Sequence, residues 1–217
     1  MHRRSYENLQ KAIFPGVGEY EIPEIQPVYE MPDIKEWLRF DQATNKRIDR
    51  DNMQECGVHF FVDDFLFNRV WDEPDKYTDR FRQYGVVLSP DFSTFTDFPK
   101  IMQVYNHYRK HWLGAYWQEH GVTVVPTISW STRASFEWCF DGEPRESIVA
   151  VSAVGTQTAP DTKQLFLEGY TEMMSRLNPK AVIFQGQVPP GCRGNIIKIP
   201  TVWVNKGPRF QEEWVGL

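Results

Sequence analysis

The chain has 217 residues, of which 41% are hydrophobic and 24% are charged, and its formal net charge is -5. This composition is typical of one globular domain with a buried core, and the negative charge excludes a bulk attraction to nucleic acid or to anionic membranes. No apolar run reaches the ~20 residues of a membrane helix, and three widely spaced cysteines argue against a disulfide framework. The sequence therefore predicts a cytoplasmic protein with no membrane partner.

The first 55 residues are interrupted by four prolines and predict an irregular N-terminal arm with one or two short helices. One such helix is expected from Asp33, an N-cap residue type, through Leu38. The arm has two interpretations. It packs along the rest of the protein through its aromatic and proline side chains, or it binds a host protein.

Residues 56–217 predict a second region, an α/β domain, because apolar runs of strand length alternate with helical patterns. Continuous apolar strands of this kind favour a mainly parallel sheet of five to six strands, covered on both faces. That number is too small for a closed eight-stranded barrel, so we expect an open sheet or an incomplete barrel. The expected strands cover 58–62, 86–88, 122–130, 147–154, 181–184 and part of 195–204, and the expected helices cover 75–85, 98–119, 134–140 and 161–177.

Polar residues follow each of the predicted strands, and in parallel α/β folds the ligand sites lie beyond these carboxyl ends. The first strand is followed by Asp63 and Asp64, and the second by Asp91. Further candidate ligand-binding residues at the strand ends are Ser89, Ser93, Thr127, Ser129, Trp130 and Ser131. Trp130 and nearby phenylalanines are candidates for stacking a base or a sugar ring.

The three aspartates are the candidate catalytic residues and the candidate ligands of Mg²⁺ or Mn²⁺, hard ions that prefer oxygen donors. Such an ion would activate water and neutralise charge in the hydrolysis of a phosphate ester, either a nucleic acid or a nucleotide. Two alternatives stay open for the same residues. Each aspartate stands where a helix begins and would serve as an N-cap, or a pair of them would act as acid and base on a sugar.

Other motifs give weaker signals. His107 and His111 are one helical turn apart, a spacing that can bind zinc, but they share a polar face with Lys110, which favours a solvated surface. Arg193 lies at the tip of a proline- and glycine-rich turn and is a candidate anion contact. The chain contains no glycine-rich phosphate loop and no dinucleotide fingerprint, so no nucleotide cofactor motif is present.

Motifs at 58–65, 87–93, 112–117, 126–131 and 166–170 occur in a characteristic order. Over residues 56 to 200 they resemble an uncharacterised domain-of-unknown-function family (forty-four-seventeen) found in bacteria, phages, prophages and plasmids. The resemblance implies a phage or mobile-element setting and brings no established activity. The best hypothesis from the residues is a divalent-metal-dependent hydrolase, and the alternative is a non-catalytic protein that sequesters a small ligand or a host protein.

Overall fold

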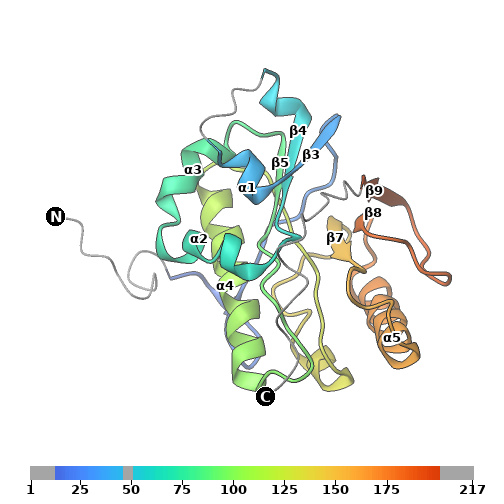
Figure 1. Cartoon of the computed structure of the whole chain (residues 1–217). Coiled ribbons are helices and arrows are strands. Elements are labelled where there is room, and N and C mark those ends of the chain that lie inside the picture. The colour runs from blue at the N-terminus through green and yellow to red at the C-terminus, as the bar shows by residue number, and fades with distance from the viewer. Residues whose placement is uncertain (1–12, 46–50, 201–217) are drawn as a thin grey trace, which may run out of the picture.

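A computed structural model describes residues 13–45 and 51–200 of the chain (Figure 1). Parallel strands and helices alternate along the sequence, which confirms the predicted α/β fold. The strands are β1 (Gly16–Val17), β2 (Ile22–Pro23), β3 (Glu36–Arg39), β4 (Cys56–His59), β5 (Val86–Leu88), β6 (Val124–Val125), β7 (Ile148–Ser152), β8 (Ala181–Gln185) and β9 (Ile196–Ile199). The helices are α1 (Phe40–Ala43), α2 (Arg69–Asp72), α3 (Asp75–Phe81), α4 (Lys100–Glu119) and α5 (Pro160–Leu177). The predicted helix at 134–140 is a 3-10 helix at Arg133–Glu137.

Seven parallel strands follow one another in chain order. Sheet B has the order β3-β4-β5-β6 and sheet C the order β7-β8-β9, and a parallel bridge between Thr127 and Ala150 connects the two sheets. Helices α4 and α5 pack against one face of the sheets, as the helices of a βα barrel do. Among the described residues β3 does not pair with β9, so the sheets do not close on each other, which agrees with either of the two expected forms, an open sheet or an incomplete barrel.

Strand residues alternate between two faces of the sheets. Val87 and Val124 contribute to one core with α4, while Val149 and Val182 contribute to a second core with α5. The other face carries a third core, which contains Val86, Leu88, Val125, Ile148, Ala150 and Ile183. Side chains of the N-terminal segment 22–35, including Val28 and Ile34, pack against this third core.

The predicted helix from Asp33 to Leu38 was wrong, because β3 occupies the second half of this stretch and pairs with β4 along its whole length. Trp37 covers Gly57 of β4 so closely that a Cβ at Gly57 would overlap the indole ring. The backbone of the segment before β3 lies at the amino ends of the strands, where Val28 bonds with Ser147 and Ile148, and Lys35 bonds with Glu55. The described part of the arm is therefore packed on the domain.

The prediction for α4 was correct in its extent and only partly correct in its buried face, since Trp112 and Tyr116 of the apolar positions at helical spacing are buried. Ile101 is 72% exposed and Tyr105 is 45% exposed, although both belong to the apolar stripe of the sequence. The predicted solvated face is buried instead, with His107, Lys110 and His111 at most 2% exposed. Polar partners on other segments make this burial possible, as described below.

No helix within 13–45 or 51–200 has the length and apolar character needed to cross a membrane.

Candidate functional site

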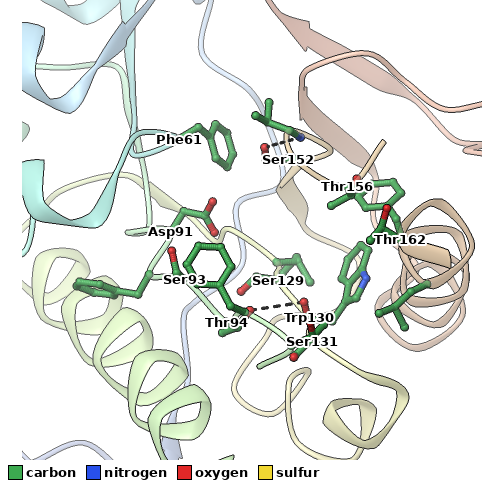
Figure 2. A pocket seen from close by; sticks show the side chains of 18 of the residues that line it. Phe61, Asp91, Ser93, Thr94, Ser129, Trp130, Ser131, Ser152, Thr156 and Thr162 are labelled. Atoms are coloured by element: carbon green, nitrogen blue, oxygen red, sulfur yellow. Dashed lines mark hydrogen bonds between the residues drawn. The ribbon is translucent and has the colours of Figure 1, made fainter. Parts of the chain in front are cut away.

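A cleft of about 470 Å³ lies beyond the carboxyl ends of β4, β5, β6 and β7 (Figure 2). Its volume is within the range of small-ligand sites. Residues that follow β4 and β5, such as Phe61 and Asp91, face Ser152 at the end of β7 and Thr156 in the β7–α5 connection. The lining also includes Val62, Asp63, Phe92, Ser93, Thr94, Phe95, Thr96, Ile128, Ser129, Trp130, Ser131, Val154, Gly155, Thr162, Leu165 and Phe166.

The carboxyl group of Asp91 points into this cleft (Figure 2). The side chain is half-buried, and its carboxylate makes no hydrogen bond and no ion pair with any described residue, so its oxygens are open to a partner that enters the cleft. Burial raises the pKa of Asp91 to about 7; the charge of Lys110 opposes this shift, and Asp64 adds to it. A lone carboxyl that titrates near neutrality inside a cleft is a common feature of binding and proton-transfer sites.

The loop that carries Asp91 is held by Asp64 and by helix α4. The carboxylate oxygens of Asp64 accept hydrogen bonds from the Ser93 backbone N–H at 3.1 Å and from its hydroxyl at 2.8 Å. Asn106 donates to the Ser93 carbonyl oxygen, and the Arg109 guanidinium lies 3.6 Å from the centre of the Phe92 ring. Asp64 thus supports the loop, while Asp91 faces the cleft.

Trp130 forms one wall of the cleft and packs on Phe166 of α5, with ring centres 5.3 Å apart. Gly169 lies directly beneath the indole, so closely that a Cβ at this position would collide with it. The backbone carbonyl of Trp130 also accepts a long hydrogen bond, 3.5 Å, from the Thr94 hydroxyl (Figure 2). The wall is therefore built jointly by the segment after β6 and by α5.

The structure brings together six of the residues predicted from the sequence to form a site. Asp63, Asp91, Ser93, Ser129, Trp130 and Ser131 line the cleft. The other four do not. Asp64 bonds to Ser93, Ser89 and Thr127 bond to each other and join β5 to β6, and the carbonyl oxygen of Arg193 accepts a hydrogen bond from Tyr170.

A second polar group is buried between α4 and the segment that follows the 3-10 helix at Arg133–Glu137. The Lys110 ammonium donates to the Thr127 carbonyl at 2.8 Å and to Oε1 of Glu143 at 2.7 Å. Nε2 of His111 lies 2.9 Å from the same Oε1, and the His107 and His111 rings are 4.4 Å apart between centres. Pairing with Glu143, which lies 32 or more residues away, explains why this face of α4 is not solvated.

Burial and the neighbouring charges shift the pKa values of the side chains in this buried group. Burial lowers the pKa of His107 well below its usual range, and the nearby Lys110 charge acts in the same direction. Burial alone would raise the pKa of Glu143, but Lys110 and His111 together hold it below the usual value. One ligand atom from each of His107, His111 and Glu143 lies within 4.8 Å of the others, so the group could hold a metal ion. Within 13–45 and 51–200 no other group of three such side chains meets this spacing.

Glu143 was not considered from the sequence, and the histidine pair was assigned to a surface. The only available signal was the four-residue spacing of two histidines around a lysine, which does not identify a partner in a distant turn. The glutamate becomes visible as a partner only when the chain from 138 to 143 is placed against α4.

Comparison with known proteins gives a family and two phage relatives. The chain is 38% identical over 177 residues to "Gene 1 protein" of Mycobacterium phage L5, which covers 81% of this chain and 75% of the relative. It is 33% identical over 207 residues to "Gene 1 protein" of Mycobacterium phage D29, which covers 93% of this chain and 74% of the relative. No solved structure matches the chain. The family model described as "Domain of unknown function (DUF4417)" matches residues 14–201, and the chain belongs to this family, as the sequence motifs indicated.

Proposed function

We propose that the cleft beside Asp91 binds a small, uncharged compound with a planar ring, of the nucleobase or nucleoside kind. The observation that carries this proposal is the Asp91 carboxyl, which points into the cleft without a hydrogen-bond partner among the described residues. A ligand that donates an N–H or O–H to this group would supply the missing partner.

The walls of the cleft suit a flat ring. Phe61, Phe95, Trp130 and Phe166 contribute aromatic surface, and stacking of a base on such rings is worth ~1–3 kcal/mol. Hydroxyl groups of serines and threonines supply both donors and acceptors around these rings. An apolar lining with a few convergent polar groups is the usual form of a small-molecule site.

The charge of the lining disfavours a free anion as ligand. Two carboxyl groups, those of Asp63 and Asp91, border the cleft, while the lining contains no lysine and no arginine. A phosphate group brought here without a cation would meet charges of its own sign. We therefore expect a nucleoside to bind more tightly than its monophosphate.

The test is calorimetric titration of the full chain with nucleosides, nucleobases and nucleoside monophosphates, without divalent metal. We expect saturable binding of at least one uncharged compound, with affinity that increases from pH 6 to pH 8 as Asp91 becomes an acceptor. Asp91→Asn should weaken binding about tenfold or more, because it replaces an acceptor atom with a donor. Asp97→Asn, at an exposed position in the same loop, is the matched control and should bind normally. Binding that is lost equally in both variants, or that prefers phosphates, would contradict the proposal.

A divalent-metal-dependent hydrolase acting on a phosphate ester is the second candidate. The observation in its favour is that Asp63 and Asp91 border the same cleft. Mg²⁺ is commonly held by one or two carboxylates together with the substrate phosphates, so two aspartates are enough in chemical terms. Turnover of nucleotides or nucleic acids with Mg²⁺ or Mn²⁺ that disappears in both Asp63→Ala and Asp91→Ala would favour this candidate over simple binding. Turnover that persists in both variants would remove it.

A further inference from the structure

The buried group on α4 contains two acceptor atoms that have no donor. Nδ1 of His107 and Oε2 of Glu143 are fully buried and make no hydrogen bond within the described part of the chain. A buried acceptor without a partner destabilises the folded state, and both atoms belong to the same small cluster. A bound cation would satisfy both atoms at once.

The histidine orientations are those of metal ligands. Nε2 of His107 lies 3.0 Å from the Asp141 carbonyl oxygen, and Nδ1 of His111 lies 2.9 Å from the Pro23 carbonyl oxygen. A carbonyl oxygen only accepts, so each of these nitrogens carries the proton. The remaining nitrogens, Nδ1 of His107 and Nε2 of His111, then present lone pairs. Metal-bound histidines characteristically donate their other N–H to a carbonyl or a carboxylate in this way.

A third feature concerns the contact between His111 and Glu143. Nε2 of His111 faces a carboxylate oxygen at 2.9 Å, and both atoms carry lone pairs if the imidazole is neutral. Two acceptors at this distance repel each other unless Nε2 carries a proton or both atoms coordinate the same metal ion. The carboxylate has a further oxygen, Oε2, that is not used by Lys110.

We propose that His107, His111 and Glu143 bind a divalent transition metal ion, with Zn²⁺ as the best fit. Two imidazole nitrogens and one carboxylate oxygen are a donor set typical of zinc and unlike the all-oxygen sites of Mg²⁺. The three side chains are buried, so the ion would tie α4 to the 138–143 segment and to Pro23 rather than meet a substrate from solvent. Its role would therefore be structural, and separate from the cleft at Asp91.

Lys110 acts against this ion and provides a discriminating variant. Its ammonium shares the Glu143 carboxylate, and a second cation nearby is repelled in a poorly screened interior. Lys110→Met keeps much of the side-chain volume and removes the charge. A metal site predicts that this variant binds Zn²⁺ about tenfold more tightly or better, whereas a simple buried ion pair predicts no gain.

The experiment uses the full chain, stripped of metal with a chelator and titrated with Zn²⁺, and with Co²⁺ as a spectroscopic probe. We expect one ion per chain, an increase in Tm on adding Zn²⁺, and the visible absorption of Co²⁺ in a site with nitrogen ligands. His107→Ala should weaken Zn²⁺ binding at least 100-fold, while His120→Ala, an exposed position at the end of the same helix, should have no effect.

Several outcomes would contradict the proposed metal site. Absence of saturable uptake by the wild-type chain would overturn the proposal without reference to any variant. Equal uptake by wild type and His107→Ala would place the ion elsewhere and would do the same. If His107→Ala does not fold, the Co²⁺ spectrum of the wild-type chain decides, since one bound ion without the absorption typical of nitrogen ligands contradicts this site.

Discussion

The Lys110 ammonium lies 2.7 Å from the Glu143 carboxylate, and neither side chain is more than 2% exposed. Breaking a buried pair by removing one partner is far more costly than losing a surface pair, because it leaves a charge without compensation. Lys110 also donates to the Thr127 carbonyl, immediately before the residues that line the cleft. The pair therefore connects the interior of α4 with a wall of the candidate site.

Glu143→Gln should destabilise the protein by about 3–5 kcal/mol, since it leaves the Lys110 charge buried without a counter-charge. Urea unfolding followed by circular dichroism would measure the change. Glu172→Gln is the matched control, because it breaks the exposed pair with Arg176 on α5 and should cost at most about 1 kcal/mol. Similar losses of unfolding free energy in both variants would show that the buried pair stabilises the protein no more than the exposed pair does.

Asp91→Asn should stabilise the protein above pH 7. The pKa of this carboxyl is about 7 in the folded chain and 3.8 as an ordinary value, so the unfolded state loses its proton first as the pH rises. The protonated form contributes its full share to the free energy of unfolding below about pH 4. This contribution, at most about 4 kcal/mol, is lost as the pH rises from about 4 to 7. Unfolding free energies of both proteins from pH 4 to 8 would test this. A difference between them that does not change with pH contradicts the prediction.

His59 makes the stability of the protein depend on pH in the opposite direction. Burial, with a smaller contribution from Arg39, lowers its pKa to about 4, and its Nδ1 accepts a hydrogen bond from the Phe61 backbone N–H at 3.3 Å. Stability should fall as the pH decreases from about 6.5 to 4, because the unfolded state binds a proton first. His59→Asn retains an acceptor but cannot be charged, so we expect it to be less sensitive to acid by up to about 3 kcal/mol in this window. Parallel curves for the two proteins would refute the assignment.

Gly169→Ala should displace Trp130, because the new Cβ would overlap the indole ring. Overpacking of this kind costs about 1–3 kcal/mol, partly offset by the ~1 kcal/mol that alanine gains over glycine within a helix. A change of tryptophan fluorescence and weaker ligand binding in the cleft would accompany the loss. Thr171→Ala, at an exposed position on the same helix, should leave the fluorescence unchanged. An unchanged spectrum in Gly169→Ala would contradict the contact.

The α/β alternation was predictable because buried parallel strands and their helices differ clearly in length and period. Val86–Leu88 and Lys100–Glu119 illustrate this, since the expected and observed ranges agree within two residues. The N-terminal strand was not predictable in this way. Trp37 and Leu38 follow an N-cap residue type, and only pairing with β4, twenty residues further on, makes the segment a strand.

The candidate cleft was predicted in location and only partly in composition. The rule for carboxyl ends placed Asp91, Ser129 and Trp130 correctly at one edge of the sheets. Ser89 and Thr127 have similar sequence positions, but their side chains point into bonds between neighbouring strands, which depends on register. The buried group at His107 was missed because periodicity records apolar positions and does not record pairing between distant charges.

The connection of Val28 with Ser147 also affects the order in which the molecule can be assembled. These residues are 119 positions apart, and Gln26 and Gln118 bond across 92 positions. A ribosome releases the segment 22–35 early, yet its partners at 118 and 147 do not exist until more than half of the chain has been made. The part synthesised first must therefore wait in an undocked form and is added late, and such long-range closure is typical of slow folding.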